Sequence, residues 1–185
     1  MKILKIILGA LGALVVLAIA IGFMLPSKRR VERSLMINAP PSAIYPLIAN
    51  LKTGWPQWTP FGPSEYPGLK VTYAGPDEGV GASQSWDSEK SGDGKLTITK
   101  ADRIRGIEYD MVTMHDSFRL TGALICEPAA NGTKMIWRDE MDAGNNLFHR
   151  YMGLLVDKRL GSSFERGLAS LKQKAEASAA ATATK

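Results

Sequence analysis

The stretch KRRVERSLMINAPPSAIYPLIANLKTGWPQWTPF, residues 28–61, decides the fold of this chain. Apolar and polar residues alternate over residues 31–38, which predicts a β-strand. Pro40-Pro41 then breaks the strand and suits the first turn of a helix, where a missing N–H group is harmless. Apolar residues recur at helical spacing over residues 44–51, and Trp55-Pro56-Gln57-Trp58 follows directly. The stretch therefore predicts a strand, a short helix and an irregular tryptophan-containing segment in immediate succession.

An uncharged apolar run precedes this stretch. Residues 6–25 contain only aliphatic residues, Gly, Ala, Phe and Met, and at about 1.5 Å per residue such a helix spans the hydrocarbon core of a bilayer, roughly 30 Å thick. We expect a single-pass membrane protein whose helix contacts the lipid bilayer through residues 3–25, with residues 1–30 forming the anchor and its basic flank. The alternative is a cleaved signal peptide, because Ala18-Ile19-Ala20 resembles a cleavage site. Residues 21–25 remain apolar, which favours the anchor.

The net charge of +5 belongs to the flanks of this run. Six of the 23 basic residues lie before residue 34, and the rest of the chain carries 17 basic and 17 acidic residues. A neutral domain lacks the concentrated positive field that binding to nucleic acid requires, so no nucleic-acid partner is expected. Basic residues are slightly more frequent after the span than before it, which favours a cytoplasmic domain by a small margin.

The remaining sequence predicts an antiparallel sheet followed by one long helix. Alternation and turn residues predict six further strands, at about residues 69–73, 81–87, 95–100, 105–114, 118–126 and 133–141. Helical spacing returns near residue 146 and continues to about residue 176, and the alanine-rich residues 177–185 are expected to be a disordered tail. We therefore expect an α+β fold over residues 31–176, in which a curved antiparallel sheet wraps around the long C-terminal helix and leaves an internal cavity.

Several motifs, in this order, cover most of the expected domain: Ile37-Asn38-Ala39-Pro40-Pro41, Trp55-Pro56-Gln57-Trp58-Thr59-Pro60-Phe61, Gly79-Val80-Gly81-Ala82, Gly132-Thr133-Lys134-Met135-Ile136-Trp137 and Phe164-Glu165-Arg166-Gly167-Leu168. With them, residues 31–174 resemble the polyketide cyclase/dehydrase branch of the SRPBCC superfamily, also called START-like or Bet v 1-like, and its membrane-anchored bacterial members. The resemblance implies a helix-grip fold around a deep hydrophobic cavity. It also implies binding of lipids, sterols, polyketides or other apolar molecules, and some members are cyclases or dehydratases.

Strand alternation identifies candidate cavity residues. Gln84 and Tyr109 are candidate polar anchors for a ligand, and filled core is the alternative for each apolar residue of the set. The predicted wall consists of Trp58, Gln84, Trp86, Tyr109, Met111, Phe118, Trp137, Met152 and Val156.

Asp139 is the one candidate catalytic residue. It shares a strand face with Trp137, so its carboxylate is expected to point inward, and a partly buried carboxylate has a raised pKa that suits a general acid or base. The alternative, which the sequence favours, is a solvated side chain at the strand end or one paired with Arg138 or Arg105.

Signatures of other chemistry are absent from the sequence. There is no Gly-rich phosphate loop, GxSxG or HExxH motif. His115 and His149 are far apart and neither has a second ligand at metal spacing, so no cofactor and no metal are expected. Both histidines are expected to be solvated, and Cys126 is expected to be a small buried apolar side chain.

These observations predict membrane-anchored binding or transport of a hydrophobic small molecule or lipid. One alternative is a cyclase/dehydratase-like lyase acting on an apolar substrate, for which the sequence offers only Asp139, Tyr109 and Gln84. Another is an interaction module whose groove binds a second membrane protein.

Overall fold

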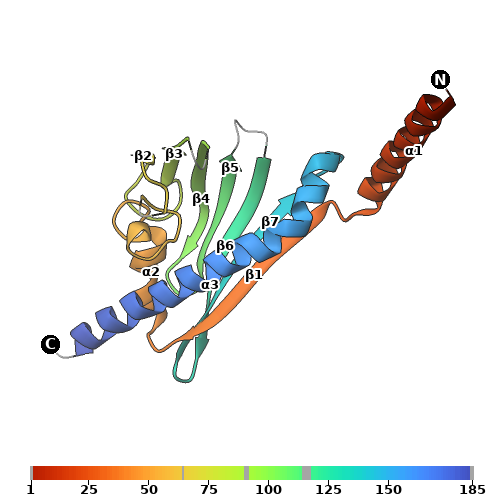
Figure 1. The fold of residues 1–185 in the computed structure, drawn as a ribbon. Helices are drawn as coiled ribbons and strands as arrows, with labels where there is room; N and C mark the ends of the chain where they lie inside the picture. Colours follow the sequence, from red (N-terminus) through yellow and green to blue (C-terminus); the bar gives the residue numbers. More distant parts are fainter. Residues whose placement is uncertain (1, 64, 90–91, 114–117, 184–185) are drawn as a thin grey trace.

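The computed structural model describes residues 2–63, 65–89, 92–113 and 118–183, and Figure 1 shows one sheet crossed by a long helix, with a separate N-terminal helix at one end. The helices are α1 (Lys2–Met24), α2 (Pro41–Ala49), the 3-10 helix η1 (Trp55–Gln57) and α3 (Leu147–Ala183). The strands are β1 (Lys28–Ile37), β2 (Lys70–Ala74), β3 (Ser83–Asp87), β4 (Gly94–Asp102), β5 (Gly106–Thr113), β6 (Phe118–Ala129) and β7 (Gly132–Asp142).

The seven strands form one antiparallel sheet in the order β1-β7-β6-β5-β4-β3-β2. From β2 to β7 each strand pairs with the next one in the chain, as hairpin connections favour. The exception is β1, which pairs along its whole length with β7, from Lys28 opposite Asp142 to Ile37 opposite Thr133. This confirms the predicted α+β helix-grip fold. It also shows that the strand at the start of residues 28–61 lies beside β7, the last strand of the chain's sheet.

The sheet begins earlier than the sequence predicted. Residues 28–30 were predicted to belong to the basic flank of the anchor. In the structure they are the first three residues of β1 and pair with β7, with Arg30 opposite Glu140. Alternating charges across two strands stabilise such a pairing, which apolar periodicity alone does not reveal.

Helix α3 runs alongside β1 and covers this edge of the sheet (Figure 1). The Nε of Arg33 donates to Glu165 Oε1 at 2.8 Å, and its Nη1 donates to Asp157 Oδ1 at 3.1 Å. Further along, the Nζ of Lys172 donates to the Met36 carbonyl oxygen at 2.8 Å. Covering an edge strand with a helix protects its unpaired backbone groups from other chains.

The C-terminal end of α3 differs from the prediction. The expected disordered tail is wrong for residues 177–183, because the helix continues to Ala183. Alanine is the strongest helix former, so an alanine-rich segment can extend a helix that is already anchored. Ala175 is fully buried and Ala179 packs against the core, so part of this extension is held by tertiary contacts.

Helix α1 stands apart from the sheet (Figure 1) and is long and apolar enough to cross a membrane. Nearly all its residues are exposed, as in a membrane span or a signal sequence. Gly22 is its one buried residue, at the point where α1 meets the start of α3.

Candidate functional site

The concave face of the sheet is filled by aromatic side chains at the end beside α2. The rings of Trp137 and Phe164 stack with centroids 4.1 Å apart and planes 4° apart. The Trp58 ring lies edge-on to the Trp137 ring, with centroids 5.2 Å apart, and its centroid is 5.0 Å from that of Trp55. The Trp58 indole N–H donates to the Leu47 carbonyl oxygen at 2.9 Å, which fixes the segment after α2 over the sheet. Two predicted wall residues, Trp58 and Trp137, are thus buried core at this end.

A chain of buried polar groups runs through this aromatic end. The Trp137 Nε1–H donates to the Tyr109 hydroxyl oxygen at 2.9 Å, and the Tyr109 hydroxyl donates to Asp139 Oδ1 at 2.6 Å. Tyr109 is 1% exposed and Asp139 is 4% exposed. The inward direction expected for Asp139 is confirmed, and the favoured alternative of a solvated or arginine-paired carboxylate is wrong. The sequence showed Tyr109 only as a separate candidate, because the distance between two strands is not visible in either one alone.

Gly122 makes this hydrogen bond possible. Tyr109, Gly122 and Asp139 lie opposite one another on β5, β6 and β7. A Cβ atom at position 122 would lie 2.1 Å from Tyr109 Cζ and 2.4 Å from Asp139 Oδ1. The tyrosine therefore reaches across β6 only because the middle strand lacks a side chain there. The signal in the sequence is a glycine at an inward position of a strand, which often marks a close approach.

Burial controls the ionisation of this pair. It raises the pKa of Asp139 to about 7, and the hydrogen bond from Tyr109 opposes this shift. The pKa of Tyr109 is raised well above its usual range by burial and then by the neighbouring Asp139. A carboxyl group that titrates near neutral pH can accept or return a proton. Its hydrogen-bond partner Tyr109 is sealed inside the core, so any reacting molecule would have to enter the aromatic end.

The other end of the concave face, nearer α1, is less completely packed. Met111 on β5, Phe118 on β6 and Val156 on α3 pack against the core but remain half-buried. Met152, one turn before Val156, is 39% exposed. The His149 ring lies edge-on to Phe118 at 5.4 Å. This end thus presents apolar, deformable side chains that retain access to solvent, as a site for an apolar molecule requires.

Two further predicted wall residues, Gln84 and Trp86, lie on β3, beyond β4 from the residues of the α1 end. Trp86 and Gln84 are half-buried on β3, which β4 separates from β5. The Trp86 ring lies over Gly94, where a Cβ atom would be 2.2 Å from Trp86 Cζ2. Gln84 pairs with Leu96, which pairs with Met111. Trp86 pairs with Gly94, whose partner Thr113 lies opposite Phe118. Both residues therefore continue the cross-strand rows of the α1 end, and neither joins the Tyr109–Asp139 pair.

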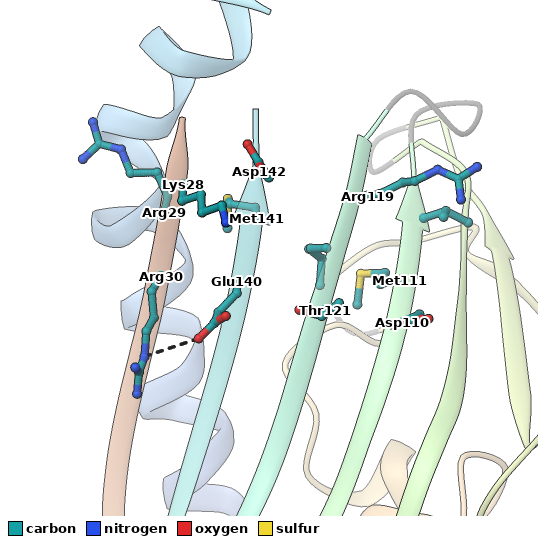
Figure 2. A pocket seen from close by; sticks show the side chains of 12 residues that line it. Lys28, Arg29, Arg30, Asp110, Met111, Arg119, Thr121, Glu140, Met141 and Asp142 are labelled. Atoms are coloured by element: carbon teal, nitrogen blue, oxygen red, sulfur yellow. Dashed lines mark ion pairs between the residues drawn. The ribbon is translucent and has the colours of Figure 1, made fainter. Parts of the chain in front are cut away.

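A pocket of about 590 Å³ lies over β1, β7, β6 and β5, and Figure 2 views it with α3 beyond the sheet. Its outward-pointing residues include Arg30 and Glu140, whose charged groups lie 3.9 Å apart, with Thr121 and Asp110 beside them. By strand alternation these side chains point away from Tyr109 and Asp139. The lining also includes Met111, Leu120 and Met141, which alternate with those residues and share the face of Tyr109 and Asp139. The pocket therefore takes in residues of both faces of the sheet, and it shares Met111 with the predicted cavity wall.

The other singled-out residues do not form a second centre. Within the described ranges, no group of three His, Cys, Asp or Glu side chains is placed to hold a metal ion. Cys126 is buried, its thiol contacts Met135 Sδ at 3.7 Å, and burial raises its pKa to about 12, which fits an apolar packing role. His115 lies outside the described residues.

Comparison with known structures supports the fold. The chain superposes on SA2116 from Staphylococcus aureus, a protein of unknown function, with a TM-score of 0.59, 12% identity, and coverage of 82% of this chain and 95% of that one. Norcoclaurine synthase of Thalictrum flavum gives a TM-score of 0.54 at 15% identity, covering 80% and 96%. CV1439 from Chromobacterium violaceum gives 0.54 at 14% identity, covering 81% and 97%. At such identities these likenesses describe the fold alone.

Sequence comparison identifies the family. No curated protein matched the chain significantly. Residues 28–176 match the family model for polyketide cyclase / dehydrase and lipid transport, which also places the start of the domain at the first residue of β1. The chain therefore belongs to the polyketide cyclase / dehydrase and lipid transport family, with the helix-grip fold of the SRPBCC superfamily.

Proposed function

We propose that this protein binds a hydrophobic small molecule or lipid between the sheet and α3, while α1 anchors it in a membrane. The observation that carries the proposal is the difference in packing along the concave face. The α2 end is filled by rings, whereas Met111, Phe118, Val156 and Met152 at the α1 end remain partly exposed.

The energetics of such a site need no polar network. Transfer of each CH₂ group from water to an apolar surface contributes about 0.8 kcal/mol, so a chain of several carbons binds through burial alone. Methionine side chains adapt to ligands of different shape. The family description, which includes lipid transport, supports this ligand class.

Native mass spectrometry of the detergent-purified full chain tests the proposal. We expect a co-purifying apolar molecule, or uptake of a fluorescent fatty acid added to the protein. Val156→Trp, which fills the α1 end, should reduce uptake severalfold, whereas Glu108→Trp, at an exposed position of β5 outside this pocket, should leave it unchanged. Equal uptake by Val156→Trp and the unmodified chain, or no binding of any fatty acid, sterol or polyketide tested, would refute the proposal.

A cyclase/dehydratase-like lyase activity is the second candidate, and the Tyr109–Asp139 pair is the observation that favours it. A carboxyl group with a pKa of about 7 can take a proton from a carbon next to a carbonyl and return it to a departing hydroxyl. The aromatic rings around it would exclude water from the reaction.

Asp139→Asn separates the two candidates. For an enzyme, this change should abolish conversion of β-hydroxyacyl or polyketide substrates while fatty-acid uptake persists. Conversion that is unchanged in Asp139→Asn and Tyr109→Phe would remove the pair from any mechanism.

A further inference from the structure

The beginning of α3 carries a concentration of exposed apolar side chains. Scattered exposed apolar residues are normal, but four within two turns of one helix mark an interaction surface. Outside α1, the exposed large apolar side chains of the described residues are Met36, Tyr73, Val80 and Ile104, each isolated in sequence, and Phe148, Met152, Leu154 and Leu155.

These turns of α3 are attached to α1. The Tyr151 hydroxyl donates to the Ala18 carbonyl oxygen at 2.5 Å. The Nη1 of Arg150 donates to the carbonyl oxygens of Phe23 at 2.9 Å and Leu25 at 3.1 Å. Leu147 and Tyr151 also close over Gly22, where an added Cβ would lie 2.9 Å from Leu147 Cδ2. The start of α3 is therefore fixed beside the last two turns of the apolar helix.

The position of Ala18 along α1 indicates how deep in a bilayer these contacts would lie. Ala18 lies seven residues before Leu25, the last apolar residue of the run, which is about 10 Å along a helix. If α1 spans a bilayer, the Tyr151 hydroxyl, which is bonded to Ala18, lies deeper in the bilayer than the point where α1 emerges from the acyl chains. The side chains around Tyr151 then cannot all be in bulk water.

We infer that residues 148–155, the first turns of α3, lie in the interface of the bilayer that α1 spans, with Phe148, Leu154 and Leu155 among the acyl chains. The inference rests on the membrane anchoring in the proposed function. Apolar residues with flanking basic groups, here Lys28, Arg150 and Lys158, are typical of helices that lie at a membrane surface.

This placement specifies how the proposed ligand enters. Within these turns the His149 ring lies edge-on to Phe118, and Val156, one turn after Met152, packs against the core. With the first turns of α3 among lipids, an apolar molecule passes from the acyl chains to the α1 end of the concave face without crossing water.

Site-specific labels on the full chain in phosphatidylcholine vesicles with phosphatidylglycerol test the depth. In a Cys126→Ala background, an environment-sensitive fluorophore is attached to Phe148→Cys or Leu155→Cys, and lipids with a nitroxide on the acyl chain are added as quenchers. Leu14→Cys, in the middle of α1, reports the span. Ile104→Cys and Val80→Cys are matched controls, because the original side chains are 61% and 59% exposed on loops of the domain.

We expect the nitroxide lipids to reduce the emission of fluorophores at positions 14, 148 and 155 and to leave the emission at positions 80 and 104 unchanged. Quenching at position 14 without quenching at 148 and 155 overturns the inference and leaves the anchoring and ligand binding intact. A label at 148 that is shielded from water but not quenched by lipid also overturns it, since a protein partner such as a second copy then covers the surface. No quenching at position 14 refutes the anchoring, and the inference with it, while fatty-acid uptake remains a separate measurement.

Discussion

The two ends of the concave face lie between the same sheet and α3, but their side chains are packed differently. At the α2 end, Trp58, Trp137 and Phe164 pack against one another and a buried hydrogen-bond chain fixes Tyr109. At the α1 end, Phe118 and Val156 are only half-buried and α3 carries exposed apolar residues. The first end is closely packed, whereas the second leaves apolar side chains in contact with solvent, which is the difference on which the proposed binding site depends.

Truncating one phenylalanine at each end tests this contrast most strongly. Phe164→Ala should reduce the free energy of unfolding by about 3–5 kcal/mol, because it removes a fully buried ring stacked on Trp137. Phe118→Ala should cost about 1 kcal/mol, since water already reaches its ring. Chemical denaturation followed by tryptophan fluorescence measures both values. Equal losses would mean that the two ends are packed alike.

The second test concerns the glycine that lets Tyr109 cross β6. Gly122→Ala should lower the free energy of unfolding by about 1–3 kcal/mol or more, because its methyl group must displace the tyrosine or the carboxylate. Gly62→Ala is the control, since an added Cβ meets nothing within 4 Å there. A neutral Gly122→Ala, measured by the same denaturation, would contradict the described position of Tyr109.

The third test uses pH. Because the pKa of folded Asp139 is raised from 3.8 to about 7, the folded state holds a proton that the unfolded state has released between these values. Its contribution to stability is therefore largest below about pH 4, declines as pH rises toward 7, and is constant above that. Asp139→Asn should flatten this decline and be at least as stable as the unmodified chain at pH 8. Unchanged slopes in thermal melts between pH 4 and 7 would contradict a buried, protonated Asp139.

The smallest effect is expected where α1 and α3 meet. Arg150→Gln removes the hydrogen bonds to the Phe23 and Leu25 carbonyl oxygens, yet a partly exposed group of this kind contributes less than about 1 kcal/mol. Denaturation of the full chain in detergent should show this small change. A loss as large as that of Phe164→Ala would indicate that the α1 end is structural.

Periodicity and turn residues predicted the sheet, the long helix and the inward face of β7, because each depends on neighbours in the sequence. The interior was harder to predict. Whether Trp58 and Trp137 line a cavity or fill it depends on Phe164, which comes from another element. The Tyr109–Asp139 hydrogen bond depends on the register of three strands and on a missing Cβ at Gly122. Residues 177–183 were assigned to a tail because composition alone does not show the packing of Ala179.

The short connection between α1 and β1 limits where the domain can work. Only Leu25, Pro26 and Ser27 separate the two elements, and three extended residues reach roughly 10 Å. With α1 in a bilayer, the domain cannot detach from that surface or cross to a distant one. Its search for a ligand is then confined to two dimensions, by lateral diffusion in its own membrane. A second membrane could receive the molecule only by approaching to within the width of the domain.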